Sequence, residues 1–320
     1  MKVIFNTGNM DAENATISSM PVGIGLGNFD GLHVGHMTLI EALIKECREN
    51  GLYSMIYTFT KHPENILRKK LFTPLLTTAL KKIELLSQTG LDYIYFDEFD
   101  EDFSRMKPDE FVKKVLIDRF GIKIAVAGFD YRFGYRGQGD AALLEELGRE
   151  HGFKVIVIPP VKVDDEVVSS TLIRSCIAKG DLEKAFRLLG RHYSITGRVV
   201  EGRHIGTTLG FPTANIEPEE HVVIPHKGVY ITKTLVDGII LNSVTNVGLN
   251  PTAGRLDKTA IETHILDFSG DLYGKNIEVF FIARIRDEKK FRGVEELVRQ
   301  IKKDVLTARE RLRGYGENTL

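Results

Sequence analysis

Apolar runs alternate with amphipathic stretches along the first half of the chain. Short β-rich runs occur at Val22–Leu26, Tyr53–Phe59, 93–96, 124–127 and 155–158. Stretches with apolar residues three and four positions apart, the spacing of a helix, lie between them at 37–49, 79–88 and 108–120. Strand–helix alternation with short links predicts a parallel, doubly wound α/β sheet with helices on both faces. Such a sheet binds ligands at the carboxyl ends of its strands.

The pattern changes near residue 193. Short β-rich runs, separated by turn signals such as Asp237-Gly238, follow at 193–201, 228–236, 239–247, 260–266 and 277–286. This spacing predicts a small antiparallel β-barrel, and the charged amphipathic stretch 293–312 predicts a C-terminal helix. Because a single hydrophobic core stops growing near ~250 residues, we expect two domains, at residues 1–185 and 186–320.

Composition and charge exclude several classes of protein. The chain has 320 residues, 42% hydrophobic and 27% charged, with a formal net charge of −1. These values are typical of a soluble globular protein, and they give no overall basic field that would attract nucleic acid. No apolar run approaches the ~20 residues of a membrane-spanning helix, and the N-terminus does not resemble a signal peptide. We therefore expect a cytoplasmic protein with small-molecule partners, whose oligomeric state stays open.

The loop after the first predicted strand contains a pair of histidines one helical turn apart. Residues 25–36 read GLGNFDGLHVGH, and a helix follows. Glycines such as Gly27 allow close approach of the backbone to phosphate, and a helix N-terminus favours anions. His33 and His36 can donate hydrogen bonds to phosphoryl oxygens, with Asn28 beside them. The alternatives are incidental histidines in a glycine-rich turn, or a zinc site, for which no third ligand is apparent nearby.

Two further segments follow later strands of the same predicted sheet. Hydroxyl groups and an arginine begin a helix at Ser169, Ser170, Thr171 and Arg174, where they can bind phosphate or simply cap the helix. The glycine-rich loop 128–140 reads GFDYRFGYRGQGD, and its aromatic side chains can either stack on a planar ring or pack on the core. His62, after the second strand, is either a ligand contact or a structural turn residue.

These motifs resemble those of the bacterial bifunctional riboflavin kinase/FAD synthetase family. The resemblance continues through LGFPTANI, KGVY, TNVGLNPT and IETHILDF, in family order, so that it covers nearly the whole chain. It implies a doubly wound, Rossmann-like nucleotidyltransferase domain that converts FMN and ATP to FAD and diphosphate. It also implies a barrel domain that phosphorylates riboflavin to FMN with ATP and Mg²⁺.

The resemblance also implies roles for individual residues. In the adenylyltransferase domain it assigns ATP binding to Gly27, Asn28, His33, His36, Ser169, Ser170, Thr171 and Arg174. Asn28, His33 and His36 would act in catalysis there, and Asp130 and Phe133 lie where the family places the flavin. We add His62 to this flavin-binding set because it follows the second strand, at the same expected edge of the sheet. In the kinase domain it assigns the Mg–ATP centre to Thr213 and Asn215 and base catalysis to Glu262. Gly202, Gly206 and Gly210 flank a loop that can hold the phosphates of ATP.

Elementary chemistry is consistent with the kinase assignments. Phosphorylation of an alcohol needs a base near the hydroxyl, and Glu262 lies in a predicted strand at the barrel. The alternative for Glu262 is an exposed cross-strand charge. Thr213 and Asn215 alternate along an extended segment, so both can offer neutral oxygens to Mg²⁺ from one side.

Some positions depart from the family pattern. Lys61 stands before His62 where the family often has proline, and Tyr135 precedes Arg136 where a basic residue usually comes earlier. These departures affect flavin affinity or redox preference rather than reaction class. Two other functions stay open from sequence, namely an FAD synthetase without kinase activity and a flavin-sensing regulatory protein with degraded catalysis.

Overall fold

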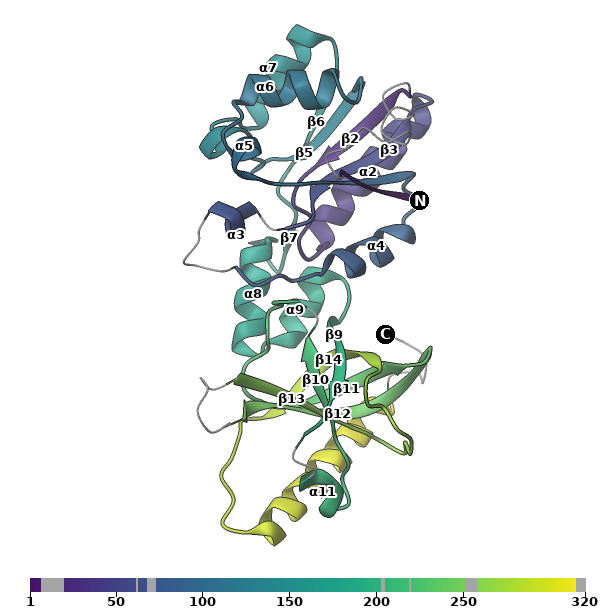
Figure 1. Ribbon diagram of the computed structural model, residues 1–320, viewed down its shortest axis with the longest axis vertical. Coiled ribbons are helices and arrows are strands. Elements are labelled where there is room, and N and C mark those ends of the chain that lie inside the picture. The colour runs from purple at the N-terminus through teal and green to yellow at the C-terminus, as the bar shows by residue number, and fades with distance from the viewer. Residues whose placement is uncertain are drawn as a thin grey trace. The chain divides into compact units, whose positions relative to one another are not determined.

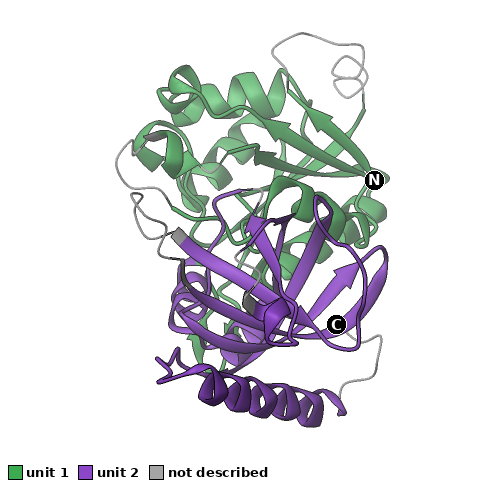
Figure 2. Cartoon of the chain, turned by 60° about the horizontal axis from the view of Figure 1, so that its bottom comes forward, with its two compact units in different colours: residues 1–170 green, residues 171–320 purple. Residues whose placement is uncertain are grey.

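The computed structural model describes residues 1–6, 20–61, 63–67, 73–202, 205–218, 220–250 and 258–314. The chain divides into two compact units, Met1–Ser170 and Thr171–Leu320 (Figure 2). Helices α8 (Ser170–Lys179) and α9 (Leu182–Leu189) follow this division, and the domain boundary expected at residue 185 stays a prediction. Among the described helices, none has the length and apolar character needed to cross a membrane.

The first unit is built on a six-stranded parallel sheet in the order β1-β4-β3-β2-β5-β6, of which Figure 1 labels β3, β2, β5 and β6. Its strands are β1 (Lys2–Phe5), β2 (Val22–Leu26), β3 (Tyr53–Phe59), β4 (Tyr93–Asp97), β5 (Ile124–Gly128) and β6 (Lys154–Ile158). The doubly wound sheet expected from sequence is therefore confirmed. Strand β1 was not expected, and it pairs in parallel with β4 at the edge of the sheet.

Helices cover both faces of this sheet. The helices that pack on it are α2 (Val34–Glu49), α4 (Ala79–Ser87), α6 (Pro108–Phe111) and α7 (Ala141–His151). The short helices α3 (Pro63–Leu67) and α5 (Glu101–Ser104) contact each other. Side chains of β5 alternate between two hydrophobic cores: Ile124 and Val126 pack with helices α2 and α4, while Ala125 and Ala127 pack with α6 and α7. This alternation is what a strand buried on both faces requires.

Two details differ from the expected elements. The single helix expected over 108–120 is α6 followed by a π-helix, η1 (Val112–Ile117), because the hydrogen bonds change their spacing after Phe111. A two-stranded hairpin of β7 (Lys162–Val163) and β8 (Glu166–Val167) was not expected. Asp164 and Asp165 form its turn with positive φ angles of 51° and 63°, a backbone conformation typical of tight hairpin turns.

Gly23 in β2 leaves the space that the Cys47 thiol of α2 occupies. A Cβ atom at Gly23 would lie 2.3 Å from the sulfur of Cys47, which is 1% exposed. Burial raises the pKa of this thiol to about 11. We expect Gly23→Ala to lower the free energy of unfolding by about 1–3 kcal/mol through overpacking, as measured by urea denaturation.

The control for this prediction removes the thiol. In a Cys47→Ala background, Gly23→Ala should cost less than it does in the wild-type chain, because the two changes share one space. Equal losses in the two backgrounds would contradict the packing explanation.

The second unit contains a closed antiparallel barrel, in the strand order β10-β13-β12-β11-β14-β9. Its strands are β9 (Tyr193–Val200), β10 (Ala214–Pro218), β11 (Gly228–Val236), β12 (Ile239–Asn250), β13 (Lys258–Ile265) and β14 (Asn276–Arg286). The short helix α10 (Ile205–Thr208) precedes β10, and α11 (Val294–Leu312) lies against β11 and β12. The expected barrel and C-terminal helix are both confirmed. Strand β10 was not among the expected strands, because its sequence indicated an extended segment and no more.

A chain of hydrogen-bonded hydroxyl groups lies buried across three strands of the barrel. It runs from Thr234 to Ser243, Thr232, Thr245 and Thr263, with oxygen–oxygen distances of 2.8–2.9 Å. All five side chains are fully buried. Each hydroxyl thus has a partner in a region where an unsatisfied polar group would be unfavourable.

Helix α11 is held to the barrel by a buried ion pair. Asp304, which is 3% exposed, accepts hydrogen bonds from Nε and Nη2 of Arg286 at 2.7–3.1 Å and from Gln300 at 2.8 Å. Removing one partner leaves a buried charge uncompensated. We therefore expect Asp304→Ala to destabilise the second unit by about 3–5 kcal/mol, as measured by thermal unfolding.

An exposed ion pair on the same helix provides the control. Arg309 binds Asp267 at 2.7 Å, but both side chains are largely exposed, and exposed pairs contribute little to stability. Arg309→Ala should therefore leave the unfolding temperature almost unchanged. Similar losses for the two variants would show that burial of the Asp304 pair is not what matters.

Candidate active sites

The first candidate site lies at the carboxyl end of β2, where the order of the sheet reverses. Strand β2 pairs with β3 on one side and with β5 on the other, so that Leu26 lies beside Tyr57 and Ala127. The loop with the two histidines and the loop after β5 therefore leave the sheet side by side. In doubly wound sheets, ligands bind in the crevice at such a reversal.

The two histidine rings form one stack at the start of α2. His33 is the N-cap, and its Nδ1 accepts a hydrogen bond from the backbone N–H of His36 at 3.2 Å. The ring centroids lie 3.6 Å apart with the planes 14° from parallel. Because a nitrogen that accepts carries no proton, His33 has its proton on Nε2, which is left as a donor. A Cβ atom at Gly35 would lie 3.3 Å from the His33 ring, so glycine leaves room for the stack.

The start of α8 reaches the same loop through a serine. The hydroxyl of Ser170 donates to the backbone carbonyl of Asp30 at 2.8 Å. This contact brings one residue of the predicted second phosphate motif to the histidine loop, next to Ser169 in sequence. Thr171 and Arg174 belong to the other unit, and their part in phosphate binding stays a prediction.

The loop after β5 contains both exposed and buried residues. Asp130 is exposed at the end of the strand, whereas Phe133 is 6% exposed and packs against Phe111 and Tyr131, with ring centroids 5.7 and 5.6 Å away. Of the loop's aromatic side chains, Phe129 is the one with a large exposed surface, at 45%. Of the two alternatives considered from sequence, stacking on a planar ring or packing on the core, Phe133 follows the second. His62 lies outside the described residues.

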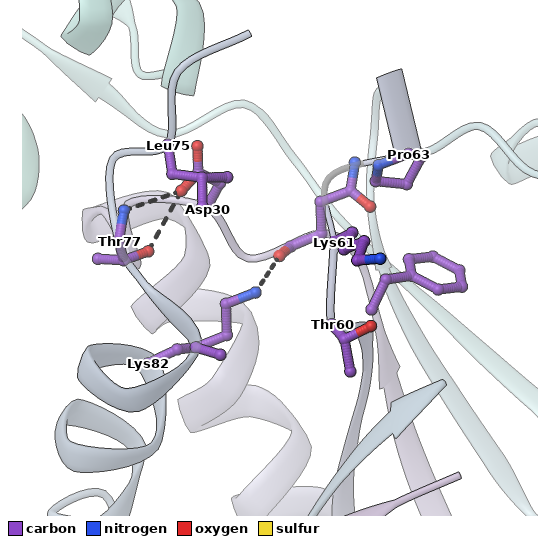
Figure 3. Close-up of a pocket in the computed structure, with 10 residues that line it drawn as sticks. Asp30, Thr60, Lys61, Pro63, Leu75, Thr77 and Lys82 are labelled. Atoms are coloured by element: carbon purple, nitrogen blue, oxygen red, sulfur yellow. Dashed lines mark hydrogen bonds between the residues drawn. The ribbon is translucent and has the colours of Figure 1, made fainter. Parts of the chain in front are cut away.

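A small polar cavity adjoins the histidine loop (Figure 3). Its walls include Asn28 and Asp30 of the loop, Lys61 after β3, and Thr77 and Lys82 near the start of α4. The cavity measures about 20 Å³, enough for about one water molecule. Lys82 was missed in the sequence because it shares the apolar face of an amphipathic helix. A lysine on the apolar face of a helix was the available sign in the sequence that its side chain is buried.

The second candidate site lies on neighbouring strands of the barrel. In the strand registers, Glu262 of β13 stands opposite Asn215 of β10 on one side and Asn246 of β12 on the other. Three polar residues therefore lie in a row across the barrel wall. Asn246 was missed as a site residue because the row depends on strand register; its place in the TNVGLNPT motif was the available signal.

Glycines before β10 lie directly against this row. A Cβ atom at Gly202 would lie 2.0 Å from the amide nitrogen of Asn215, and one at Gly206 would lie 2.4 Å from the carbonyl oxygen of Phe211 and 3.3 Å from the hydroxyl of Thr213. The backbone therefore approaches Thr213 and Asn215 as closely as only glycine permits.

His264 connects β13 to the segment before β10. Its Nδ1 lies 2.8 Å from the carbonyl oxygen of Pro212, and its ring meets that of Phe211 edge to face at 5.6 Å. His264 stands two residues after Glu262 on the same strand. The strand that carries the carboxylate thereby fixes the segment that carries Thr213.

Comparison with known proteins places a different family on each half of the chain. The model of the FAD synthetase family matches residues 17–172, and that of the riboflavin kinase family matches residues 189–312. A bifunctional riboflavin kinase/FMN adenylyltransferase from Escherichia coli is 37% identical over 286 residues, which are 89% of this chain and 91% of the relative. One from Bacillus subtilis is 36% identical over 285 residues, covering 88% and 89%.

A solved structure resembles the whole chain. It is a crystal structure described as a macrolide-efflux protein from Streptococcus pneumoniae, with a TM-score of 0.85 and 30% sequence identity. The alignment covers 97% of this chain and 99% of that one. The same pair of folds is therefore present in that protein.

Proposed function

Because the chain belongs to the family of bifunctional riboflavin kinase/FMN adenylyltransferases, we propose that the two reactions of this family take place in separate domains. The enzyme phosphorylates riboflavin to FMN with ATP and then joins FMN to the AMP part of a second ATP, giving FAD and diphosphate. The observation that carries the division is that the two family models match separate ranges, with His33 and His36 in one and Glu262 in the other. We assign adenylylation to residues 1–185 and phosphorylation to 186–320.

In adenylylation, a phosphate oxygen of FMN attacks the α-phosphorus of ATP, and the bond to the β-phosphate breaks. Negative charge grows on the leaving diphosphate. We assign its stabilisation to Nε2–H of His33, to His36 and to the N-terminus of α2, with Gly27 and Asn28 in the adjoining loop. Ser169, Ser170, Thr171 and Arg174 are proposed to hold the remaining phosphates, which the Ser170–Asp30 contact supports.

The flavin of this reaction is proposed to bind at the loop after β5. Asp130 is exposed there and can accept hydrogen bonds, while Phe133 shapes the site from within the core. His62, which follows β3 in the sequence, completes the proposed set. The loop leaves β5 next to β2, and this adjacency would bring the flavin phosphate to the ATP phosphates.

In phosphorylation, Glu262 is proposed to take the proton of the terminal ribityl hydroxyl, whose oxygen then attacks the γ-phosphorus of ATP. The bond from that phosphorus to the bridging oxygen of the β-phosphate breaks, and ADP leaves. Gly202, Gly206 and Gly210 border the segment proposed to receive the phosphates. Thr213 and Asn215 would hold Mg²⁺: the close approach of Gly202 keeps space for the Asn215 amide, and both side chains offer the oxygen ligands that Mg²⁺ prefers. When bound, the ion neutralises charge on the β- and γ-phosphates.

Product chromatography tests this proposal with the complete chain. Incubation with riboflavin, ATP and Mg²⁺ should yield FMN and FAD, and chelation of the metal should stop FMN formation. FMN without FAD would remove the assignment of residues 1–185, and no turnover would favour the regulatory alternative. Cys47 and Cys176 are buried and not joined in a disulfide, which supports the proposed cytoplasmic location.

A further inference from the structure

The loop between β2 and α2 has an unfavourable backbone conformation. Phe29 and Leu32 have positive φ angles of 49° and 39°, although both are bulky and fully buried. Such a conformation is unfavourable for a bulky side chain and persists only where its surroundings enforce it. The contacts that hold this loop therefore bear on the geometry of the histidines that follow it.

One set of contacts holds the middle of the loop to the segment before α4 (Figure 3). The buried carboxylate of Asp30 accepts hydrogen bonds from the backbone N–H groups of Leu76 and Thr77, each at 3.0 Å. In return, the backbone N–H of Gly31 donates to the hydroxyl of Thr77 at 2.9 Å. These bonds fix the positions of Asp30 and Gly31.

A lysine from α4 holds the start of the same loop. Nζ of Lys82 donates to the backbone carbonyl of Asn28 at 2.8 Å and to the hydroxyl of Thr58 at 3.2 Å. The Thr58 hydroxyl donates to the same carbonyl at 3.1 Å. Three groups from α4, β3 and the loop thus form a closed triangle, and Figure 3 shows Lys82 reaching toward the loop.

A buried ammonium group at this point calls for a functional explanation. Lys82 is only 7% exposed and lies 5.9 Å from the centre of the Phe96 ring. Taking a charged group out of water is unfavourable, and an apolar side chain of similar length would fill the space at lower cost. The ammonium provides what such a side chain cannot, namely a strong donor to the Asn28 carbonyl and a positive charge beside the loop.

We infer that Lys82 is a positioning residue for adenylyl transfer. By holding the carbonyl of Asn28, its ammonium group keeps the loop in the conformation that presents His33 and His36 to the phosphates. Lys82 acts through the loop backbone and Thr58 and needs no contact with the reacting atoms. The inference rests on the proposed phosphate role of the histidine loop.

The test compares lysine-to-methionine variants of the complete chain. Lys82→Met should lower kcat for FMN adenylylation by ~10-fold to ~100-fold, since small misplacements of catalytic groups have effects of this size. The KM for FMN and the rate of riboflavin phosphorylation should stay within about twofold of wild type. Lys45→Met, at a side chain that is 74% exposed on α2, is the matched control and should change neither activity.

Substitutions of Thr58 test the same three hydrogen bonds with a smaller change than Lys82→Met. Thr58→Val should lower kcat in the same way, whereas Thr58→Ser, which keeps the hydroxyl, should not. Because both side chains act on one carbonyl, Lys82→Met and Thr58→Val together should lower kcat by less than the product of their separate effects. If the double variant lowered kcat by the full product of the two single effects, Lys82 and Thr58 would not act through the same carbonyl, and the inference would be overturned.

The remaining outcomes separate this inference from the proposed function. An adenylylation kcat for Lys82→Met within twofold of Lys45→Met overturns the inference, as does a parallel loss of both activities. If His36→Ala is slow while Lys82→Met and Thr58→Val are normal, only the role of Lys82 is wrong. If His36→Ala adenylylates FMN at the normal rate, the phosphate role of the loop falls, and this inference falls with it.

Discussion

Glu262→Ala should abolish detectable FMN formation from riboflavin while the conversion of supplied FMN to FAD continues. Loss of a general base typically lowers a rate by ~10²- to ~10⁴-fold. Glu262 stands in the row with Asn215 and Asn246 in the barrel, and His33 and His36, which are proposed to act in adenylylation, lie in the other unit. The two reactions are followed separately, by supplying either riboflavin or FMN with ATP and Mg²⁺ and quantifying the flavins by chromatography.

A second glutamate of the barrel provides the control for this variant. Glu217 is exposed on β10, the strand next to β13, and Glu217→Ala should leave FMN formation close to the wild-type rate. Glu262→Gln keeps the size of the side chain and should be as slow as Glu262→Ala, because only the carboxylate can accept a proton. A normal kinase rate in Glu262→Gln would exclude base catalysis by this residue, and loss of both activities in Glu262→Ala would contradict the division into two sites.

His36→Ala should slow FAD formation by ~10²-fold or more and leave riboflavin phosphorylation unchanged. Removal of one donor that stabilises a developing charge has an effect of this size. The His36 ring also stacks on His33 and lies 5.2 Å from Phe29, so its loss frees the partner ring as well. Single-turnover formation of FAD from FMN and ATP measures the chemical step directly.

The control for this prediction is the same substitution at another histidine, His151→Ala. His151 is an exposed residue at the end of α7, and its replacement should not alter either reaction. His33→Ala should resemble His36→Ala, because the two rings form one stack. If His36→Ala converted FMN to FAD at the wild-type rate, the histidine pair would have no part in stabilising the diphosphate.

Much of the fold could be predicted because its pattern is local. Strands β2, β3 and β11 begin and end where the apolar runs do, since a buried strand is marked by its own residues. Strand β1 could not be found in this way: its four residues form a strand because they pair with β4, far along the chain. The π-helix after Phe111 likewise leaves the apolar pattern intact while the hydrogen bonds shift by one residue.

In the candidate sites, too, the sequence located residues within continuous motifs but not those that join a site through the fold. Motifs located His33, His36 and Glu262 because they are continuous in sequence. Asn246 joins Glu262 only through the register of β12 and β13. Lys82 stands on the apolar face of α4, but a lysine at such a position can also extend to solvent, so its burial follows only from how α4 packs.

The buried hydroxyl chain of the barrel determines where Glu262, the proposed catalytic base, stands. Along β13, Ile261 and Thr263 are buried and Glu262 faces the other way. If β13 slid by one residue along β12, every side chain would change face. A slide of two residues would separate Thr263 from Thr245 and leave hydroxyls unsatisfied inside the barrel, at about 1–3 kcal/mol for each group. A shifted β13 is thus penalised on the inner surface of the barrel. The position of Glu262 on the outer surface, and with it the distance to the substrate proposed for it, is set by residues that this substrate would not meet.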